Sequence, residues 1–298
     1  MPFFLMASGA VLLGKEDNAW KLAKRALRMI ICLIVFSYLY YCLKSKAHNE
    51  SIQLFTFLYG ISDASKWMQS LWYLYAYLAY IASIPFLKHI ARGLGKNTFF
   101  YFLSLNSIIT CCIPIIKHYS GIEFSSSFML INWTVNTIVF YPIIGYFIVT
   151  SIDEIKRLEL IVLNGITVLL YLIVFGLTYM DAIIDGLSWT STTWIDIMIP
   201  FCSVTIFCDL YYYLQKLELS SKVKSIILCV SQSTFGIYLI HPVVLFYWLP
   251  MKEIWVLESS IFVGVEMVGA IVICLLIMIV CFVFVYLLRK IPLVRKIL

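Results

Sequence analysis

The sequence has 298 residues, of which 62% are hydrophobic and only 13% are charged. A soluble globular domain usually carries about 25% charged residues, so this chain has too little polar surface to cover a water-exposed globule. We expect an integral membrane protein, with room for one helix bundle but not for two membrane domains. The net charge of +6 does not indicate a nucleic-acid-binding protein, because the basic residues gather in particular loops, as topology signals do.

The hydrophobic residues form segments long enough to cross a bilayer. A transmembrane helix needs about 20 apolar residues to span a hydrocarbon core about 30 Å thick, and its backbone must satisfy its own hydrogen bonds. We therefore predict an all-α, polytopic transmembrane bundle. The stretch at residues 1–13 is too short to cross alone and is predicted to be a partial N-terminal span. Eight full spans are expected at residues 26–43, 67–87, 98–116, 127–150, 158–179, 194–214, 225–249 and 260–288.

The basic residues alternate between loops, which predicts the orientation. Of the 22 Lys and Arg residues, 17 lie in alternate segments, namely 14–28, 88–96, 151–158, 215–224 and the C-terminal tail. Only five lie in the intervening ones. Because positively charged loops stay in the cytoplasm, we expect a multi-pass protein of the cell membrane with a cytoplasmic C-terminus.

A cluster of positive charge lies at the start of the first full span. Arg25 and Arg28 stand three residues apart, which places both guanidinium groups on one face of a helix. Such a fork suits phosphate, so both arginines are candidates for binding a phosphorylated donor such as a coenzyme A thioester, a substrate and not a bound cofactor. Arg pairs at cytoplasmic span ends also serve as topology anchors, which is the alternative interpretation.

Aromatic residues crowd the start of the next span, which is expected to enter from outside. Trp72, Tyr73, Tyr75 and Tyr77 follow Ser70 within a few residues. Aromatic faces can stack on sugar rings, so Trp72 and Tyr75 are candidates for binding a glycan acceptor. An aromatic belt at the membrane interface would explain the same residues without any function.

The segment Ser231–Pro242 carries the most informative pattern. His241 lies about 24 Å along its expected helix at 1.5 Å per residue, in the outer half of the membrane. Tyr238 precedes it by three residues on one face, and Gly236 permits close helix approach. A desolvated His can act as a general base toward a hydroxyl, so His241 and Tyr238 are candidate catalytic residues and Ser233 a candidate for binding substrate. A structural hydrogen bond to a neighbouring helix is the alternative.

Other polar groups within the spans are weaker candidates. Glu266 lies in the outer part of the last span, where it could pair with His241, so it joins the candidates for binding substrate. In-span amides such as Asn106 and Asn164 could equally hold helices together. The nine cysteines lie in apolar runs without a C-x-x-C pair. We expect them to be packing residues, and no disulfide or metal site is predicted.

Four of these stretches together resemble acyltransferase family 3, whose multi-pass enzymes O-acylate bacterial surface polysaccharides and related acceptors. Pro2–Gly9 resembles the P-x-F-F-x-x-S-G of that family's second helix, and Arg25–Arg28 its R-x-x-R. Leu71–Leu74 resembles its L-W-F-L-like fourth helix, and Ser233–His241 the S-x-G-x-Y-L-x-H of its ninth. The resemblance implies that Arg25 and Arg28 contact the acyl donor.

One part of the family pattern has no counterpart here. The family usually has ten helices, and its first supplies a His that is considered central to catalysis. Nothing in this sequence matches that helix, and His241 corresponds to a different family position. We therefore expect residues 1–298 to form a single transmembrane acyltransferase-like domain that is incomplete at its N-terminus.

The favoured hypothesis is transfer of an acyl group, with acetyl expected, from a cytoplasmic coenzyme A thioester to a hydroxyl of a cell-envelope polysaccharide. The partners would be acyl-CoA, the glycan acceptor and the lipid bilayer, with no nucleic acid. Two alternatives remain from the same residues. The chain could export a polysaccharide or a lipid-linked sugar, with the polar residues lining a path, or it could be a truncated, inactive remnant of the acyltransferase.

Overall fold

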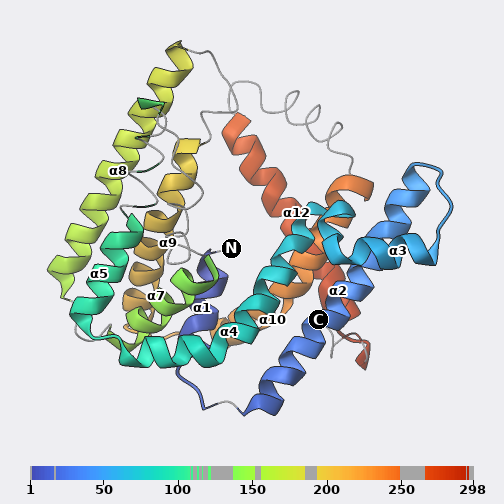
Figure 1. Ribbon diagram of the computed structural model, residues 1–298, viewed down its shortest axis with the longest axis horizontal. Helices are drawn as coiled ribbons and strands as arrows, with labels where there is room; N and C mark the ends of the chain where they lie inside the picture. The colour runs from blue at the N-terminus through green and yellow to red at the C-terminus, as the bar shows by residue number, and fades with distance from the viewer. Residues whose placement is uncertain are drawn as a thin grey trace. The chain divides into compact units, whose positions relative to one another are not determined.

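The computed structural model describes residues 2–16, 18–107, 137–151, 156–184, 193–248 and 266–292, together with residue 294 and a few isolated positions between 109 and 121. Across these residues the chain forms helices and connecting turns, and no strand occurs among them. The predicted all-α class is confirmed to that extent. Figure 1 shows the helices in chain order.

The helices of the described residues have the following bounds. The α-helices are α1 (Pro2–Leu12), α2 (Ala19–Ala47), α3 (Leu54–Gly60), α4 (Trp72–Gly93), α5 (Lys96–Ser107), α7 (Thr137–Ser151), α8 (Arg157–Ile184), α9 (Thr193–Leu214), α10 (Ser221–Val243) and α12 (Glu266–Leu288). Three short elements are η1 (Ile61–Lys66), η2 (Gln69–Leu71) and the π-helical turn η7 (Val244–Trp248).

Five stretches are long and apolar enough to cross a membrane. They are Ala19–Ala47, Gln69–Gly93, Arg157–Asp181, Ser221–Tyr247 and Ile271–Leu288, and they coincide with five of the eight predicted spans. The apolar stretches Ile138–Ser151 and Met198–Leu214, within α7 and α9, are shorter, and α5 has 12 residues. The chain is therefore a membrane protein with several apolar helices, while the predicted number of eight full spans is not confirmed within the described residues.

The chain divides into two compact units. Unit 1 comprises Met1–Asn18 and Ala79–Glu218, and unit 2 comprises Ala19–Leu78 and Leu219–Leu298. The long helix α4 begins in unit 2 and ends in unit 1. Each unit is described by itself below.

Unit 1 is built around very close contact between α1 and α7. A Cβ on Gly9 would lie 2.1 Å from the carbonyl oxygen of Pro142, and a Cβ on Gly145 would lie 2.0 Å from that of Met6. Neither glycine can carry a side chain unless the helices separate, because the obstructing atoms belong to the backbone. The two helices thus pack main chain against main chain, as small residues allow in membrane proteins.

Two hydrogen-bonded rungs join α8 to α9 in unit 1. Asn164 Nδ2 donates to Asp209 Oδ1 at 3.1 Å, and the hydroxyls of Thr167 and Thr205 lie 2.7 Å apart. The amide of Asn164 also donates to the carbonyl of Leu160 at 2.9 Å. The interpretation of Asn164 as a residue that holds helices together is therefore confirmed.

The ends of the helices in unit 1 agree with the predicted alternation of loops. Arg92 Nη1 lies 2.9 Å from Glu16 Oε1, and Lys88 Nζ donates to the carbonyl of Lys15. These residues belong to segments 14–28 and 88–96, which are predicted to lie on the same side of the membrane. The contacts bring both segments together as that prediction requires.

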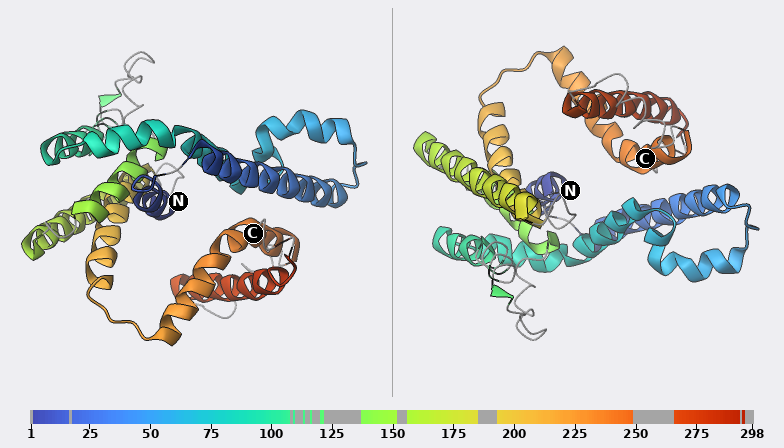
Figure 2. Two further views of the ribbon diagram at one scale, coloured as in Figure 1. Left: turned by 90° about the horizontal axis from the view of Figure 1, so that it is seen from below. Right: turned by 90° about the horizontal axis from the view of Figure 1, so that it is seen from above.

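In unit 2, α10 and α12 lie side by side, as both views of Figure 2 show. A Cβ on Gly236 of α10 would lie 2.6 Å from Cγ1 of Val285 on α12. The prediction that Gly236 permits close helix approach is confirmed. Because α12 runs back along α10, its end lies beside the first half of α10, where Arg289 bonds Gln232.

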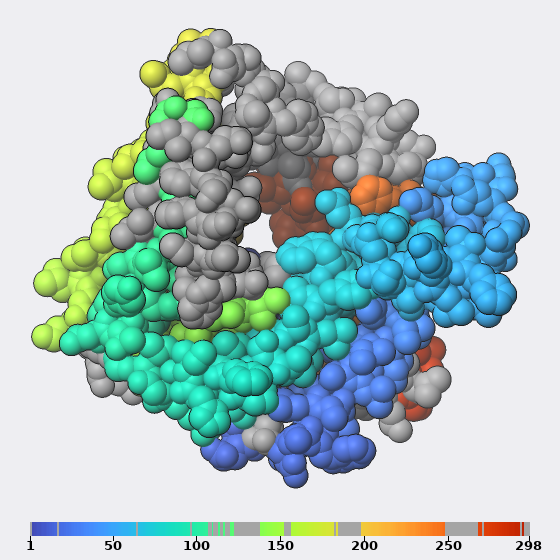
Figure 3. All heavy atoms as spheres, viewed as in Figure 1, coloured from blue at the N-terminus to red at the C-terminus, as the bar shows by residue number. Residues whose placement is uncertain are grey.

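In unit 2, residues 48–71 between α2 and α4 form a folded segment, called the cap below. Lys44 Nζ donates to the carbonyl of Lys66 at 2.9 Å, and the backbone N–H of Gln53 donates to the Tyr41 hydroxyl at 2.9 Å. A Cβ on Gly60 would meet the ring of Trp67 at 2.4 Å. In the space-filling view of Figure 3 this segment forms a filled layer in light blue. The cap holds the chain in place where it enters α4.

Candidate functional site

All eight residues that the sequence singles out belong to unit 2. They come from the start of α2, the start of α4, the length of α10 and the start of α12. These residues are Arg25, Arg28, Trp72, Tyr75, Ser233, Tyr238, His241 and Glu266. The fold thus gathers residues from three distant parts of the sequence into one compact unit.

The centre of the site is a break in the backbone hydrogen bonding of α10 at Pro242, which lies inside the continuous helix. A proline nitrogen carries no hydrogen, so the carbonyl four residues earlier loses its helical partner. That carbonyl belongs to Tyr238, and Nδ1 of His241 lies 2.7 Å from it. A carbonyl oxygen only accepts, so Nδ1 carries the hydrogen of this bond. In the neutral ring Nε2 is then unprotonated and able to accept a proton.

Tyr40 of α2 bonds the next carbonyl of α10, that of Leu239. Its buried hydroxyl donates to the carbonyl of Leu239 at 2.7 Å. The chain then continues into the π-helical turn η7. A side chain from α2 thus bonds the backbone of α10 directly after the residue whose helical partner Pro242 removes, and polar backbone groups in lipid need such partners.

Tyr238 joins α10 to the entry of α4. Its hydroxyl donates to the carbonyl of Ser70 in the segment that contains η2, and its ring packs edge-on against Tyr73, with centroids 5.3 Å apart and planes at 71°. The rings of Tyr238 and His241 lie 5.8 Å apart. The prediction that these two side chains share a face is confirmed. The Tyr238 hydroxyl thus bonds the backbone of the segment before α4, and the predicted catalytic role of Tyr238 stays a prediction.

The two aromatic candidates for binding a glycan, Trp72 and Tyr75, differ in their surroundings. Trp72 is half-exposed, and its ring packs against Tyr73 with centroids 6.3 Å apart. The hydroxyl of Tyr75 donates to the carbonyl of Ile61 in the cap. Trp72 is therefore exposed in the described structure, whereas the polar end of Tyr75 bonds the cap, and the predicted contact of both residues with a glycan stays a prediction.

The two arginines of the R-x-x-R pattern lie in the first third of α2. Arg25 is partly exposed and Arg28 is exposed. Tyr40, which meets α10 at the break, lies 12 residues further along the helix, about 18 Å at 1.5 Å per residue. The arginines are thus separated along α2 from the level at which Tyr40 meets α10, and their service at the opposite end from His241 stays a prediction.

Glu266 begins α12, but its side chain lies outside the described residues. Its predicted pairing with His241 therefore stays a prediction. No group of three or more His, Cys, Asp or Glu residues suited to a metal ion occurs in the described part of the chain.

With the site's geometry established, comparison with known families identifies the domain. The acyltransferase 3 family model, an acyltransferase domain, matches residues 1–288. This chain belongs to that family. Comparison with curated proteins and with solved structures gave no match.

The match covers all the motifs from which the resemblance was inferred. In this acyltransferase-family chain, Gly9 of the first motif makes the backbone contact between α1 and α7. The last motif, Ser233–His241, contains both the close approach at Gly236 and the break that engages His241. The motif residues of the acyltransferase domain thus include packing positions as well as candidate chemical groups.

Ser233 lies in a polar cluster that sequence reasoning missed. It is fully buried, donates to the carbonyl of Cys229 at 2.9 Å and accepts from Arg289 Nη1 at 3.3 Å. Arg289 Nη2 also donates to Gln232 Oε1 at 3.0 Å. In the sequence, nothing separates Arg289 from the topology anchors that commonly follow a last span. Ser233 therefore bonds Arg289, and its predicted contact with substrate stays a prediction.

Tyr40 was missed for a different reason. It lies in an aromatic run of α2 that matches no family motif, and its partner is 199 positions away in the sequence. A tyrosine in a span whose hydroxyl must find a partner was the available signal. That signal does not say which helix supplies the partner.

Proposed function

We propose that this protein is a membrane-bound O-acyltransferase that transfers an acyl group, acetyl being the one expected, from acyl-CoA to a hydroxyl of a cell-envelope polysaccharide. The family supports acyl transfer. The observation that carries the finer proposal is the hydrogen bond of His241 Nδ1 to the Tyr238 carbonyl, because it leaves Nε2 as a base for a hydroxyl. Membership of the family favours this reading over export of a polysaccharide.

In the proposed reaction His241 moves one proton. Nε2 takes the proton of the acceptor hydroxyl as its oxygen attacks the thioester carbonyl carbon. A C–O bond forms, the C–S bond breaks, and the departing sulfur recovers the proton from Nε2. The products are an ester and free coenzyme A. General base catalysis of this kind typically contributes about 10²–10⁴-fold in rate.

The donor side of the proposal rests on Arg25 and Arg28. Their spacing on α2 suits the phosphates of coenzyme A, since guanidinium groups bind phosphate through paired hydrogen bonds. The helix rise puts about 18 Å between Arg28 and the level of Tyr40. Coenzyme A carries its thioester at the end of a long flexible arm, so its phosphates and its acyl carbon can occupy different levels of unit 2.

The acceptor side rests on the exposed face of Trp72. Trp72 follows directly on η2, whose Ser70 carbonyl is bound by Tyr238. A sugar stacked on Trp72 would therefore be held by the segment that Tyr238 fixes to α10. We propose that this side faces out of the cell and that the C-terminus lies in the cytoplasm, in line with the positive-inside rule.

The test separates donor binding, measured on the purified protein, from acyl transfer, measured in complemented cells. Arg28→Ala is expected to weaken binding of acetyl-CoA about tenfold or more, because it removes a charged hydrogen-bond donor. His241→Gln is expected to leave donor binding within about twofold but to lower acyl transfer at least 10²-fold. Binding is measured by equilibrium dialysis, and transfer by labelled acetyl groups on the envelope glycan of complemented cells.

Arg157→Gln provides a matched control, because Arg157 is an exposed arginine at a helix start in unit 1. It should change neither quantity. Glycan acylation that persists at the normal level in both test variants would refute the proposed roles. A defect in glycan export without loss of acyl groups would favour a transporter instead.

A further inference from the structure

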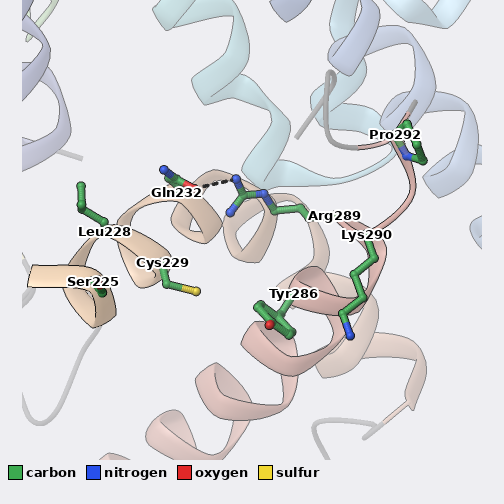
Figure 4. A pocket seen from close by; sticks show the side chains of 8 residues that line it. All are labelled: Ser225, Leu228, Cys229, Gln232, Tyr286, Arg289, Lys290 and Pro292. Atoms are coloured by element: carbon green, nitrogen blue, oxygen red, sulfur yellow. Dashed lines mark hydrogen bonds between the residues drawn. The ribbon is translucent and has the colours of Figure 1, made fainter. Parts of the chain in front are cut away.

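A cavity of about 860 Å³ lies between the first half of α10 and the end of α12, within unit 2. Its walls include Ser225, Cys229 and Gln232 from α10, and Tyr286, Arg289 and Lys290 from α12 and the turn after it. Figure 4 shows the two sets of side chains facing each other. Small-molecule sites commonly occupy about 300–1,000 Å³, so the space suits a ligand of nucleotide or lipid-headgroup size.

Arg289 is held in this cavity by neutral partners. Its Nη2 donates to Gln232 Oε1 at 3.0 Å, the bond drawn in Figure 4, and its Nη1 donates to the buried Ser233 hydroxyl at 3.3 Å. Nε is buried and has no hydrogen-bond partner among the described residues. An arginine that served only as a membrane anchor would extend into the headgroup region. Arg289 instead turns toward α10.

The charge in the cavity is not balanced by the residues that the structure describes. No carboxylate of the described chain lies within ion-pair distance of Arg289, and none of the described lining side chains is acidic. Lys290 adds a second positive charge, with Nζ 5.4 Å from the centre of the Tyr286 ring. Lys290 is exposed, but Arg289 is partly buried, and holding its guanidinium there without a counter-charge is costly. An anionic ligand would remove that cost.

We propose that this cavity binds a phosphate group, with Arg289 and Lys290 as the cationic ligands and Gln232 as the side chain that orients the guanidinium. A guanidinium recognises phosphate through its fork of N–H groups, and an ammonium adds a point charge. Apolar lining from Leu228 and Tyr286 suits a ligand that carries an apolar or aromatic part beside its phosphate. Both a soluble phosphoester and a phospholipid headgroup fit that description.

This site is separate from the proposed donor arginines and from the proposed base. Gln232 precedes His241 by nine residues on α10, about 14 Å at 1.5 Å per residue. Arg25 and Arg28 do not line the described cavity. The inference does not depend on the proposed acyl transfer, because it concerns binding and is measured without turnover.

The test measures binding and its location together. The full-length protein in phosphatidylcholine nanodiscs is titrated with adenosine 3′,5′-bisphosphate, which carries the phosphate chemistry of the acyl donor without its thiol. Alkylation of Cys229, which lines the cavity and is partly exposed, is followed by mass spectrometry of its peptide. A second series replaces part of the phosphatidylcholine with phosphatidylglycerol and omits the bisphosphate.

Saturable protection of Cys229 by the bisphosphate would establish a soluble phosphoester as the ligand. Protection only in phosphatidylglycerol discs would establish a lipid headgroup. In either case Arg289→Gln should weaken protection about tenfold or more, while Arg289→Lys and Lys290→Gln should weaken it less, and Arg157→Gln should leave it unchanged.

Two results would overturn the proposal. One is that neither probe slows the alkylation of Cys229. The other is that Arg289→Gln is protected as well as the wild type. If Arg289→Gln fails to fold, Arg289→Lys is used instead, because it keeps the charge and loses only the fork of N–H groups. Protection of Arg289→Lys equal to that of the wild type would then overturn the proposal. Loss of acyl transfer in His241→Gln with normal Cys229 protection would separate this site from the proposed reaction.

Discussion

The backbone contact between α1 and α7 in unit 1 offers a demanding test of the fold. Gly145→Ala would place a Cβ 2.0 Å from the carbonyl oxygen of Met6. Because the obstructing atom belongs to the backbone of α1, no side-chain rotation relieves the overlap. The helices must move apart by about 1.4 Å to restore an ordinary contact of 3.4 Å.

That separation would weaken the whole contact between α1 and α7. A gap of about 0.5–1 Å already forfeits a quarter to a half of each dispersion contact. Inserting a methyl group into a well-packed interior costs about 1–3 kcal/mol. Since α1 can move only as a rigid piece, we expect a loss near the upper limit, about 3 kcal/mol. For a chain of this size that lowers Tm by about 6–12 °C. Gly9→Ala should behave alike, because its Cβ would meet Pro142.

Thermal unfolding in detergent, followed by tryptophan fluorescence, measures the effect. Gly165→Ala and Gly176→Ala are matched controls, because both glycines lie within α8 with no atom in reach of an added Cβ. Ala is preferred over Gly in a helix by roughly 0.5–1 kcal/mol, so these variants should be as stable as the wild type or more so. If Gly145→Ala melts with the controls, the proposed backbone contact between α1 and α7 is wrong.

Three further substitutions test the contacts of the site and of unit 1. Pro242→Ala restores a backbone N–H that competes with His241 for the Tyr238 carbonyl, so it should raise Tm yet lower acyl transfer about tenfold or more; a rise in both would contradict the role given to the break. Tyr40→Phe removes the hydroxyl bound to Leu239 and should cost about 1–3 kcal/mol of unfolding free energy, whereas exposed Tyr101→Phe, its control, should cost nothing measurable. Asn164→Leu removes the bond to Asp209 and should cost about 0.6 kcal/mol, seen as a small fall in Tm; no fall would mean that the rung does not stabilise the pair of helices.

Much of the fold could be predicted from local patterns. Segment hydropathy predicted the helices, since apolar length is set by the thickness of the membrane and not by partners. The alternation of basic loops predicted which ends lie together, and the contact of Arg92 with Glu16 agrees with it. The helix period placed Tyr238 beside His241, because residues three apart share a face whatever surrounds them.

Some sequence expectations reached further than the described structure. The number of eight full spans stays a prediction, because the segments at 98–116 and 127–150 include residues outside the described structure. Ser233 was expected to bind substrate because of its place in a motif. The structure shows it buried and hydrogen-bonded to Arg289, so the expected substrate contact stays a prediction.

The sequence by itself determined that this protein is helical, lies in the membrane and carries the motifs of an acyltransferase domain, because composition, apolar length and motif spacing are properties of the chain read locally. Only the tertiary structure decided that Tyr40 bonds the Leu239 carbonyl of α10 and that Arg289 turns toward Gln232 in a cavity. In lipid every helix is apolar on most sides, so no amphipathic pattern marks which faces will meet. The partners of polar groups are chosen by packing between segments far apart in the sequence, and that choice appears only when the chain is folded.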